Sequence, residues 1–176
     1  MKKIIFFIFL SLLIISKSFS ENFKLEKIIS LNEPWGSSFV NKDEIIITEK
    51  SGRIKIINLK SKKINNIEHD LNFVEYGQGG LLDILYEKGY VWVSYTESRE
   101  NWKTSTSIAK SKFNYNKLFF KNIFRAEPPI DSPYHFGSRL AIKDDYLYAS
   151  AGERGKGMIA QDPTKHTGSI ISIYKD

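Results

Sequence analysis

Apolar residues occur along most of the chain in short runs, separated by polar and turn residues. In Ile54-Lys55-Ile56 and Tyr146-Leu147-Tyr148 they alternate, or nearly so, as in strands of an antiparallel sheet. No long segment repeats its apolar positions at the helical period. We therefore predict an all-β fold, with strands over residues 23–30, 37–40, 44–49, 54–59, 81–86, 90–96, 107–113, 118–124, 139–142, 146–151 and 169–174.

Three parts of the chain share one pattern: small residues, a short apolar strand, a turn and a second β-rich strand. These units begin at Gly36, Gly79 and Gly137, 43 and 58 residues apart. These spacings bracket the roughly 40–50 residues of a four-stranded propeller blade. Small residues suit the innermost strand of a blade, because these strands converge on the central channel. The repeat favours a β-propeller over the alternative, a β-sandwich in which Gly and Ser only mark loop ends.

The N-terminus has the pattern of a secretory signal peptide. Lys2 and Lys3 precede an apolar run over residues 4–15, and Ser18-Phe19-Ser20 supplies small residues for cleavage. The run is shorter than the roughly 20 residues that a membrane-spanning helix needs. We therefore predict a signal peptide over residues 1–20, cleaved after Ser20, and a propeller part over residues 21–176. The product would be periplasmic or secreted, without a stable membrane anchor.

Charge and cysteine content exclude several classes of protein. The net charge of +6 includes three lysines of the predicted signal peptide, and without them the balance is that of an ordinary soluble surface. The remaining basic residues are scattered, which argues against a nucleic-acid partner. The chain has no cysteine, so disulfide scaffolds, zinc ribbons and thiol catalysis are excluded.

Of the three histidines, His135 is the best candidate for chemistry. It lies two residues before Gly137, just ahead of the third unit, a position that faces the channel mouth in a propeller, and an imidazole can take a proton from a substrate hydroxyl. The alternative is a histidine packed against Phe136 and bonded to a backbone carbonyl. His69 lies in a polar stretch and is interpreted as a solvated loop residue.

Gln78 occupies the corresponding point of the preceding unit, between Gly77 and Gly79. Glycine on both sides lets the backbone approach a ligand closely, and an amide can donate and accept hydrogen bonds. The loop lacks the P-loop lysine and no helix follows. Arg154 could bind an anion or pair with Glu153 or Asp162 at the surface. No acidic cluster with metal-ligand spacing is present, so no metal ligand is predicted in this chain.

Several short motifs, taken in order, resemble the glucose/sorbosone dehydrogenase family. They are residues 77–83 (Gly-Gln-Gly-Gly-Leu-Leu-Asp), 135–140 (His-Phe-Gly-Ser-Arg-Leu), 152–154 (Gly-Glu-Arg) and 160–162 (Ala-Gln-Asp). Residues 33–36 and 48–53 also resemble the family's first blade. The resemblance covers essentially all of residues 25–174, and it is strongest to the periplasmic aldose sugar dehydrogenases that use pyrroloquinoline quinone (PQQ).

The resemblance implies a six-bladed propeller of four-stranded antiparallel blades, of which this chain supplies about three. It also implies PQQ over one end of the channel, with Gln78 in contact with the quinone. His135 would be the general base that takes the proton of a sugar C1 hydroxyl while hydride passes to the quinone. The partners would be an aldose and an electron acceptor, and the product a lactone.

In the family, further basic residues for PQQ and the ligands of Ca²⁺ come from later blades. We therefore expect most cofactor ligands beyond Asp176, and a chain that is an N-terminal half, inactive by itself. Two other functions stay open from sequence. One is a non-catalytic exported propeller that binds a protein or glycan, and the other is a strictosidine-synthase-like or lactonase-like propeller with a channel Ca²⁺. Gln78 and His135 at one mouth of the channel would favour the dehydrogenase.

Overall fold

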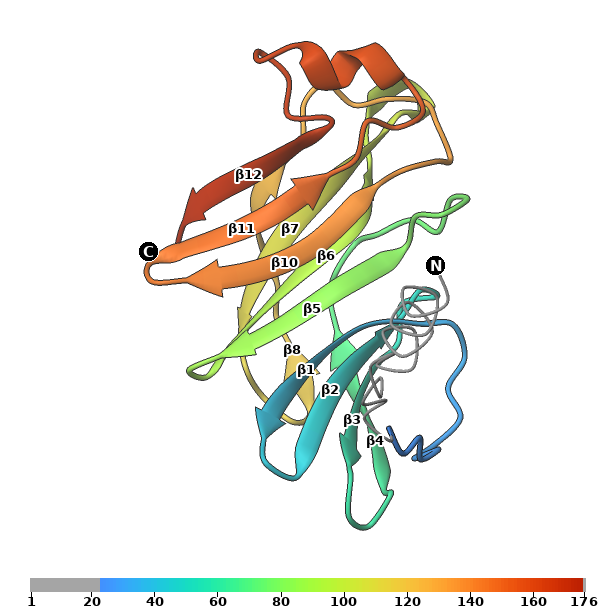
Figure 1. The fold of residues 1–176 in the computed structure, drawn as a ribbon, viewed down its shortest axis with the longest axis vertical. Helices are drawn as coiled ribbons and strands as arrows, with labels where there is room; N and C mark the ends of the chain where they lie inside the picture. The colour runs from blue at the N-terminus through green and yellow to red at the C-terminus, as the bar shows by residue number, and fades with distance from the viewer. Residues whose placement is uncertain (1–22, 176) are drawn as a thin grey trace, which may run out of the picture.

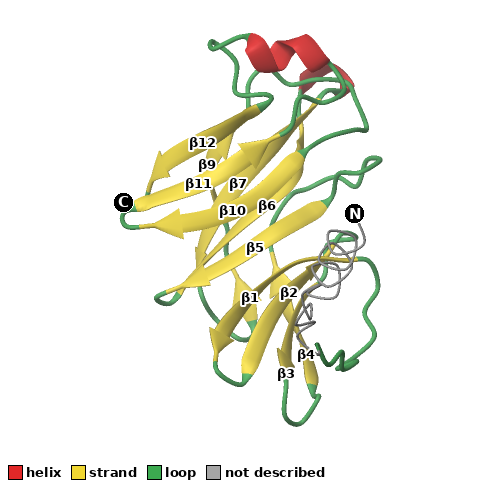
Figure 2. Cartoon of the chain, viewed as in Figure 1, coloured by secondary structure: helices red, strands yellow, loops and turns green. Residues whose placement is uncertain are grey.

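Three twisted β-sheets follow one another along the chain and stack face to face (Figure 1). The computed structural model describes residues 23–175, so the predicted signal peptide lies outside the described residues. Strands and loops dominate, with two short 3-10 helices (Figure 2), which confirms the all-β prediction. The elements are β1 (Pro34–Asn41), β2 (Glu44–Glu49), β3 (Ile54–Asn58), β4 (Ile64–His69), β5 (Leu81–Glu87), β6 (Tyr90–Ser98), η1 (Glu100–Trp102), β7 (Thr104–Lys112), β8 (Lys117–Leu118), β9 (Lys121–Arg125), β10 (Gly137–Lys143), β11 (Tyr146–Ala151), η2 (Gly157–Gln161) and β12 (Ser169–Tyr174).

Each sheet starts at one of the three predicted units. The first sheet has the order β1-β2-β3-β4, with β8 added parallel to β4. The second has the order β5-β6-β7-β9 and the third β10-β11-β12. The second sheet has the four antiparallel strands predicted for a blade. The first has β8 in addition to its four antiparallel strands, and the third has three strands among residues 23–175. The sheets are arranged like successive propeller blades and do not close into a ring within these residues.

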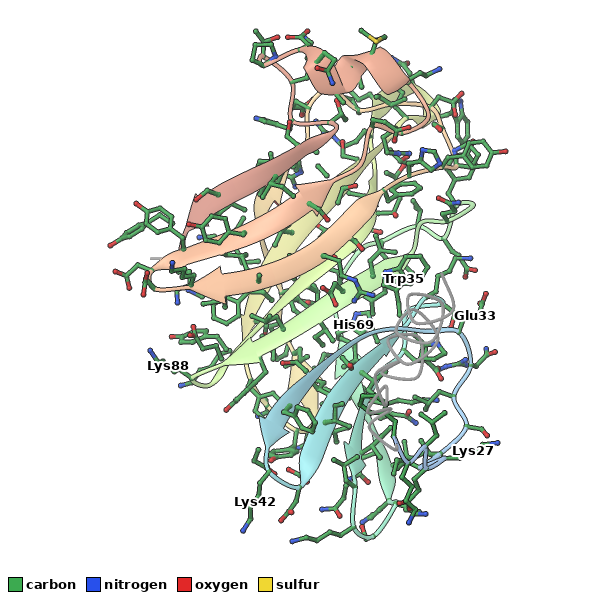
Figure 3. All side chains as sticks on the ribbon, in the orientation of Figure 1. Lys27, Glu33, Trp35, Lys42, His69 and Lys88 are labelled. Carbon is green, nitrogen blue, oxygen red and sulfur yellow. The ribbon has the colours of Figure 1, made fainter. Side chains whose placement is uncertain are left out.

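The first strands of the three sheets lie side by side (Figure 1). A Cβ on Gly36 in β1 would lie 2.7 Å from the Cα of Asp83 in β5, so only glycine permits this approach. Trp35, labelled in Figure 3, donates from Nε1 to the Ser138 hydroxyl of β10 over 3.2 Å. The predicted reason for small residues at the start of each unit, convergence of the inner strands, is thereby observed.

The hydrophobic core consists of two clusters, one on each face of the second sheet. Val91, Val93 and Tyr95 of β6 pack toward the first sheet, and Trp92, between them in sequence, packs toward the third. Successive side chains of a strand point to opposite faces, so a strand buried on both faces is apolar almost continuously. This explains why residues 90–96 do not alternate in polarity.

Three predictions of strands differ from the structure. Residues 23–30 form no strand, although their pattern suits one. The strand β4, between β3 and β8, is not among the predicted strands because it is largely polar, and Ile67 is its one fully buried residue. The predicted strand over residues 118–124 is two strands: β8 pairs with the first sheet and β9 with the second.

Candidate active site

The loop before β10 presents His135 at the end of the sheets that carries the longer loops. His135 has a left-handed backbone, with φ of 49°, and its side chain is 56% exposed. The loop packs closely on the end of β11, where a Cβ on Gly152 would lie 1.8 Å from the His135 carbonyl oxygen. Gly152 in turn donates its backbone N–H to the Phe136 carbonyl over 3.0 Å. The imidazole is therefore accessible while its backbone is fixed.

Glu153 is the partner of the His135 imidazole. The Nδ1 atom of His135 lies 2.6 Å from Oε1 and 2.9 Å from Oε2 of Glu153, and the backbone N–H of Gly155 donates to the same carboxylate over 3.1 Å. The hydrogen bond from His135 lowers the pKa of Glu153 from its usual value, so the carboxylate is ionised near neutral pH. The sequence contains a signal for this pair, since Gly152-Glu153 follows the second strand of the unit that His135 precedes and is part of the 152–154 motif, but sequence alone does not predict the contact of Glu153 with His135.

Gln78 reaches the same loop from the second sheet. Its Oε1 accepts the backbone N–H of His135 over 2.8 Å, and its own backbone N–H donates to the Pro133 carbonyl over 2.8 Å. Gly77 makes this approach possible, because a Cβ there would lie 2.4 Å from the Pro133 carbonyl oxygen. The two residues singled out from sequence are thus in direct contact at one end of the sheets. Since Oε1 is engaged, the amide Nε2 is the end of Gln78 that can donate to a ligand.

Arg154 contradicts both interpretations made from sequence. It is 1% exposed, so it neither binds a surface anion nor forms a surface ion pair. Its Nε donates to the Tyr134 carbonyl over 3.0 Å, and Nη1 donates to the Thr104 carbonyl over 3.0 Å. Burial lowers its pKa to about 10. Asp162 does not pair with Arg154 either: its Oδ1 accepts the N–H and hydroxyl of Thr164 in a turn.

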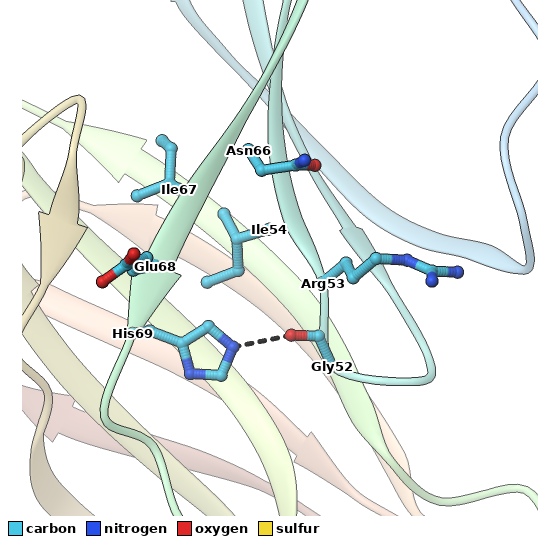
Figure 4. Close-up of a pocket in the computed structure, with 7 residues that line it drawn as sticks. All are labelled: Gly52, Arg53, Ile54, Asn66, Ile67, Glu68 and His69. Atoms are coloured by element: carbon cyan, nitrogen blue, oxygen red, sulfur yellow. Dashed lines mark hydrogen bonds between the residues drawn. The ribbon is translucent and has the colours of Figure 1, made fainter.

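The other two histidines have partners away from this loop. His69 is not a solvated loop residue: it ends β4, and its Nε2 lies 2.6 Å from the Gly52 carbonyl oxygen in a hollow of about 350 Å³ (Figure 4). His166 accepts the N–H of Glu127 at Nδ1 over 3.0 Å. His135 is therefore the histidine that the structure combines with both a carboxylate and the Gly77–Gly79 loop.

Neither a metal site nor a membrane-spanning helix is found among the described residues. No group of three or more His, Asp or Glu side chains within residues 23–175 could hold a metal ion. In the same part of the chain, no helix is long and apolar enough to cross a membrane.

The chain is similar to known proteins over most of its length. Among curated relatives, it is 26% identical over 153 residues to aldose sugar dehydrogenase YliI of Escherichia coli (strain K12), covering 81% of this chain and 41% of that protein. It is 29% identical over 172 residues to the uncharacterized protein slr1608 of Synechocystis sp., with 83% and 41% covered. This chain therefore spans less than half the length of these relatives.

Solved structures give the same result. The apo form of the soluble aldose sugar dehydrogenase from Escherichia coli superimposes with a TM-score of 0.77 at 26% identity, covering 82% of this chain and 45% of that one. The PQQ-bound aldose sugar dehydrogenase from Streptomyces coelicolor shares the fold, with a TM-score of 0.75 at 22% identity and 85% and 47% covered. The sequence model of the family described as Glucose / Sorbosone dehydrogenase matches residues 31–176. The chain belongs to the glucose/sorbosone dehydrogenase family.

Proposed function

We propose that this chain forms the part of a PQQ-dependent aldose dehydrogenase that carries the general base, in an enzyme that is exported to the periplasm or secreted. The observation that carries the proposal is the contact of His135 with both Glu153 and Gln78. An imidazole that is held at one ring nitrogen by a carboxylate and is more than half exposed has the arrangement of a general base.

Glu153 determines which nitrogen of His135 acts as the base. An ionised carboxylate can only accept hydrogen bonds, so Nδ1 of the imidazole carries the proton. In the neutral ring, the lone pair then lies on Nε2, which is able to accept the proton of a sugar C1 hydroxyl. Glu153 would also stabilise the imidazolium cation that this transfer produces.

PQQ, when bound, supplies the acceptor for the hydride that leaves C1, and an external electron acceptor reoxidises it. Gln78 would hold one edge of such a cofactor, because its Oε1 is engaged by the His135 backbone N–H and its Nε2 could donate a hydrogen bond to a quinone oxygen. Arg154 does not suit the cofactor carboxylates, since its guanidinium is buried and bonded to backbone carbonyls. Loss of the C1 hydride and of the hydroxyl proton to His135 turns the cyclic aldose into a lactone.

The remaining parts of the proposal come from the family. Closing a six-bladed ring would require residues other than 23–175. The same holds for the ligands of Ca²⁺ and for the basic side chains that would bind the PQQ carboxylates. Residues 23–175 hold no group of three or more acidic or histidine side chains that could bind Ca²⁺, and no step proposed for His135, Glu153 or Gln78 depends on the ion. We accordingly expect the 176-residue chain alone to be inactive.

The test of this proposal is an activity assay on a chimeric enzyme. A chimera in which the remaining part of the Escherichia coli relative follows Asp176 is loaded with PQQ and Ca²⁺ and assayed with aldoses and an artificial electron acceptor. We expect reduction of the acceptor and accumulation of lactone, and loss of turnover with PQQ still bound in His135→Ala. A folded chimera that binds PQQ but oxidises no aldose would contradict the proposal, and would favour a propeller that only binds a protein or glycan.

A further inference from the structure

A buried cation lies directly behind the exposed His135 loop. Among the fully buried side chains of residues 23–175, that of Arg154 has the largest volume. Its Nη2 donates to the Thr104 hydroxyl over 2.8 Å and to the Ser132 carbonyl, and its guanidinium carbon lies 3.6 Å from the centre of the Phe136 ring. No carboxylate of residues 23–175 forms an ion pair with it. The guanidinium is therefore held by carbonyls, a hydroxyl and a ring.

These partners surround His135 in sequence. The guanidinium binds the carbonyls of Ser132 and Tyr134 before it and contacts Phe136 after it. The backbone N–H of Arg154 also donates to the His135 carbonyl over 3.3 Å. Because Glu153 directly precedes Arg154 in the chain, holding Arg154 in place also restrains the backbone of Glu153, so one residue anchors both members of the His135–Glu153 pair.

The backbone at this point has to be held in place. His135 and Arg154 both have left-handed backbones, with φ of 49° and 59°, which L-residues adopt rarely and which persist only where the surroundings impose them. Thr104, at the start of β7, gives the guanidinium two contacts with the second sheet. The loop of the third sheet is thereby connected to a strand of the second.

A buried unpaired cation is an expensive way to fill this space. Desolvation opposes the charge, as the lowered pKa of Arg154 shows, and a well-packed apolar side chain would cost less. What the guanidinium adds is geometry, since its donors lie in a rigid plane and point to several carbonyls at once. An ammonium group of similar reach lacks that plane.

We propose that Arg154 is a positioning residue of the candidate active site, which places the His135 imidazole against Glu153 without itself touching substrate or cofactor. Its consequence for turnover rests on the proposed function. Its consequence for the His135–Glu153 contact does not, and can be measured on the 176-residue chain without PQQ.

The first test is NMR spectroscopy of the 176-residue chain. In the wild-type chain we expect a downfield Nδ1–H resonance of His135, assigned by its loss in His135→Gln. Arg154→Ala should lose this resonance, and guanidinium ion added to that variant should restore it by filling the vacated space. Arg154→Lys keeps the charge and should also lose it, which separates geometry from electrostatics. Arg125→Ala, which removes an arginine paired at the surface with Glu97, should keep it.

The second test is kinetic and uses the PQQ-loaded chimera. Arg154→Ala should lower kcat roughly tenfold to a hundredfold with little change in KM, since misplacement of a catalytic group acts on the chemical step, and guanidinium should recover part of the loss. If Arg154→Ala does not fold, folding in the presence of guanidinium followed by its removal gives the same comparison. A folded Arg154→Lys or Arg154→Ala chain with the His135 resonance unchanged would overturn the proposal. Inactivity of the wild-type chimera would count against the proposed function alone.

Discussion

The carboxylate of Glu153 faces Nδ1 of the His135 imidazole, with both of its oxygens within 2.9 Å of that nitrogen. The two residues come from different loops, 18 positions apart in the chain. Their contact therefore depends on the third sheet being folded, and it fixes the ring tautomer before any ligand binds.

Replacing Glu153 by Gln tests this tautomer. The amide can donate to Nδ1 and so favours the form with the proton on Nε2, which is no longer a base. We expect kcat of the PQQ-loaded chimera to fall about a hundredfold, within the range that general-base catalysis contributes. Glu127→Gln, at an exposed carboxylate paired with Arg99, is the control and should retain full turnover. Equal turnover of the two variants would remove Glu153 from the mechanism.

Gly152→Ala should destabilise the loop that carries His135. The added methyl would lie 1.8 Å from the His135 carbonyl oxygen and 2.8 Å from the backbone nitrogen of Gly137, and both are backbone atoms, which cannot swing aside as a flexible side chain can. We expect a loss of about 3 kcal/mol or more in urea unfolding, at the upper end for overpacking. Gly89→Ala, where a Cβ meets nothing within 4 Å, should lose only the roughly 1 to 2 kcal/mol of a left-handed residue. Similar losses at both positions would contradict the close approach.

Glu49 makes stability depend on acid pH. Burial alone would raise its pKa, but hydrogen bonds from Lys55, Arg53 and the backbone of Asn32 outweigh burial and lower it to about 2. Because the unfolded chain takes up the proton more readily, the contribution is complete above about pH 4.5 and is lost as pH falls toward 2. We expect urea unfolding to show roughly 3 kcal/mol of this loss.

The control for Glu49 is Glu49→Gln, which has no carboxyl group to titrate. Its free energy of unfolding should be lower at pH 7 and should change much less between pH 5 and pH 2. A wild-type chain whose acid loss equals that of Glu49→Gln would show that other groups cause it.

Asp83→Ala should weaken the contact between the second and third sheets. Asp83 is 5% exposed, and its Oδ2 accepts the backbone N–H of Leu140 in β10 over 2.8 Å. Alanine leaves that N–H buried without a partner, which costs about 1–3 kcal/mol, measurable by urea unfolding. Asp145→Ala, in the exposed β10–β11 turn, should change stability by less than about 0.5 kcal/mol. A loss at Asp83 no larger than this would contradict the assigned contact.

Sequence predicted the strands that carry a buried face. Residues 146–151 and 169–174 match β11 and β12 to the residue, because each combines β-branched or aromatic residues with clear turns. The strand β4 was not predicted, since most of its side chains are exposed and it therefore has few apolar residues. Residues 23–30 were wrongly predicted as a strand because an alternating pattern does not say whether a partner strand is present, and Leu25 is 97% exposed.

The candidate site was predictable in part. Gln78 lies directly before Gly79 and His135 lies two residues before Gly137, so each stands out at the start of a unit, and a repeat places such positions together. Arg154 could not be assigned, since its burial is decided by three carbonyls from two separate segments, the loop that carries Ser132 and Tyr134 and the start of β7 at Thr104. The pairing of Glu153 with His135 likewise depends on the two loops meeting in space.

The nine residues over 117–125 join two sheets. Their first two residues extend the first sheet as β8, and their last five complete the second as β9; between them, Phe120 donates its N–H to Asp70 over 2.8 Å. A hinge motion that separated the first sheet from the second would have to break the pairing of either β8 with β4 or β9 with β7. The two sheets should therefore move as one rigid body, because residues 117–125 connect them on the side away from the converging first strands.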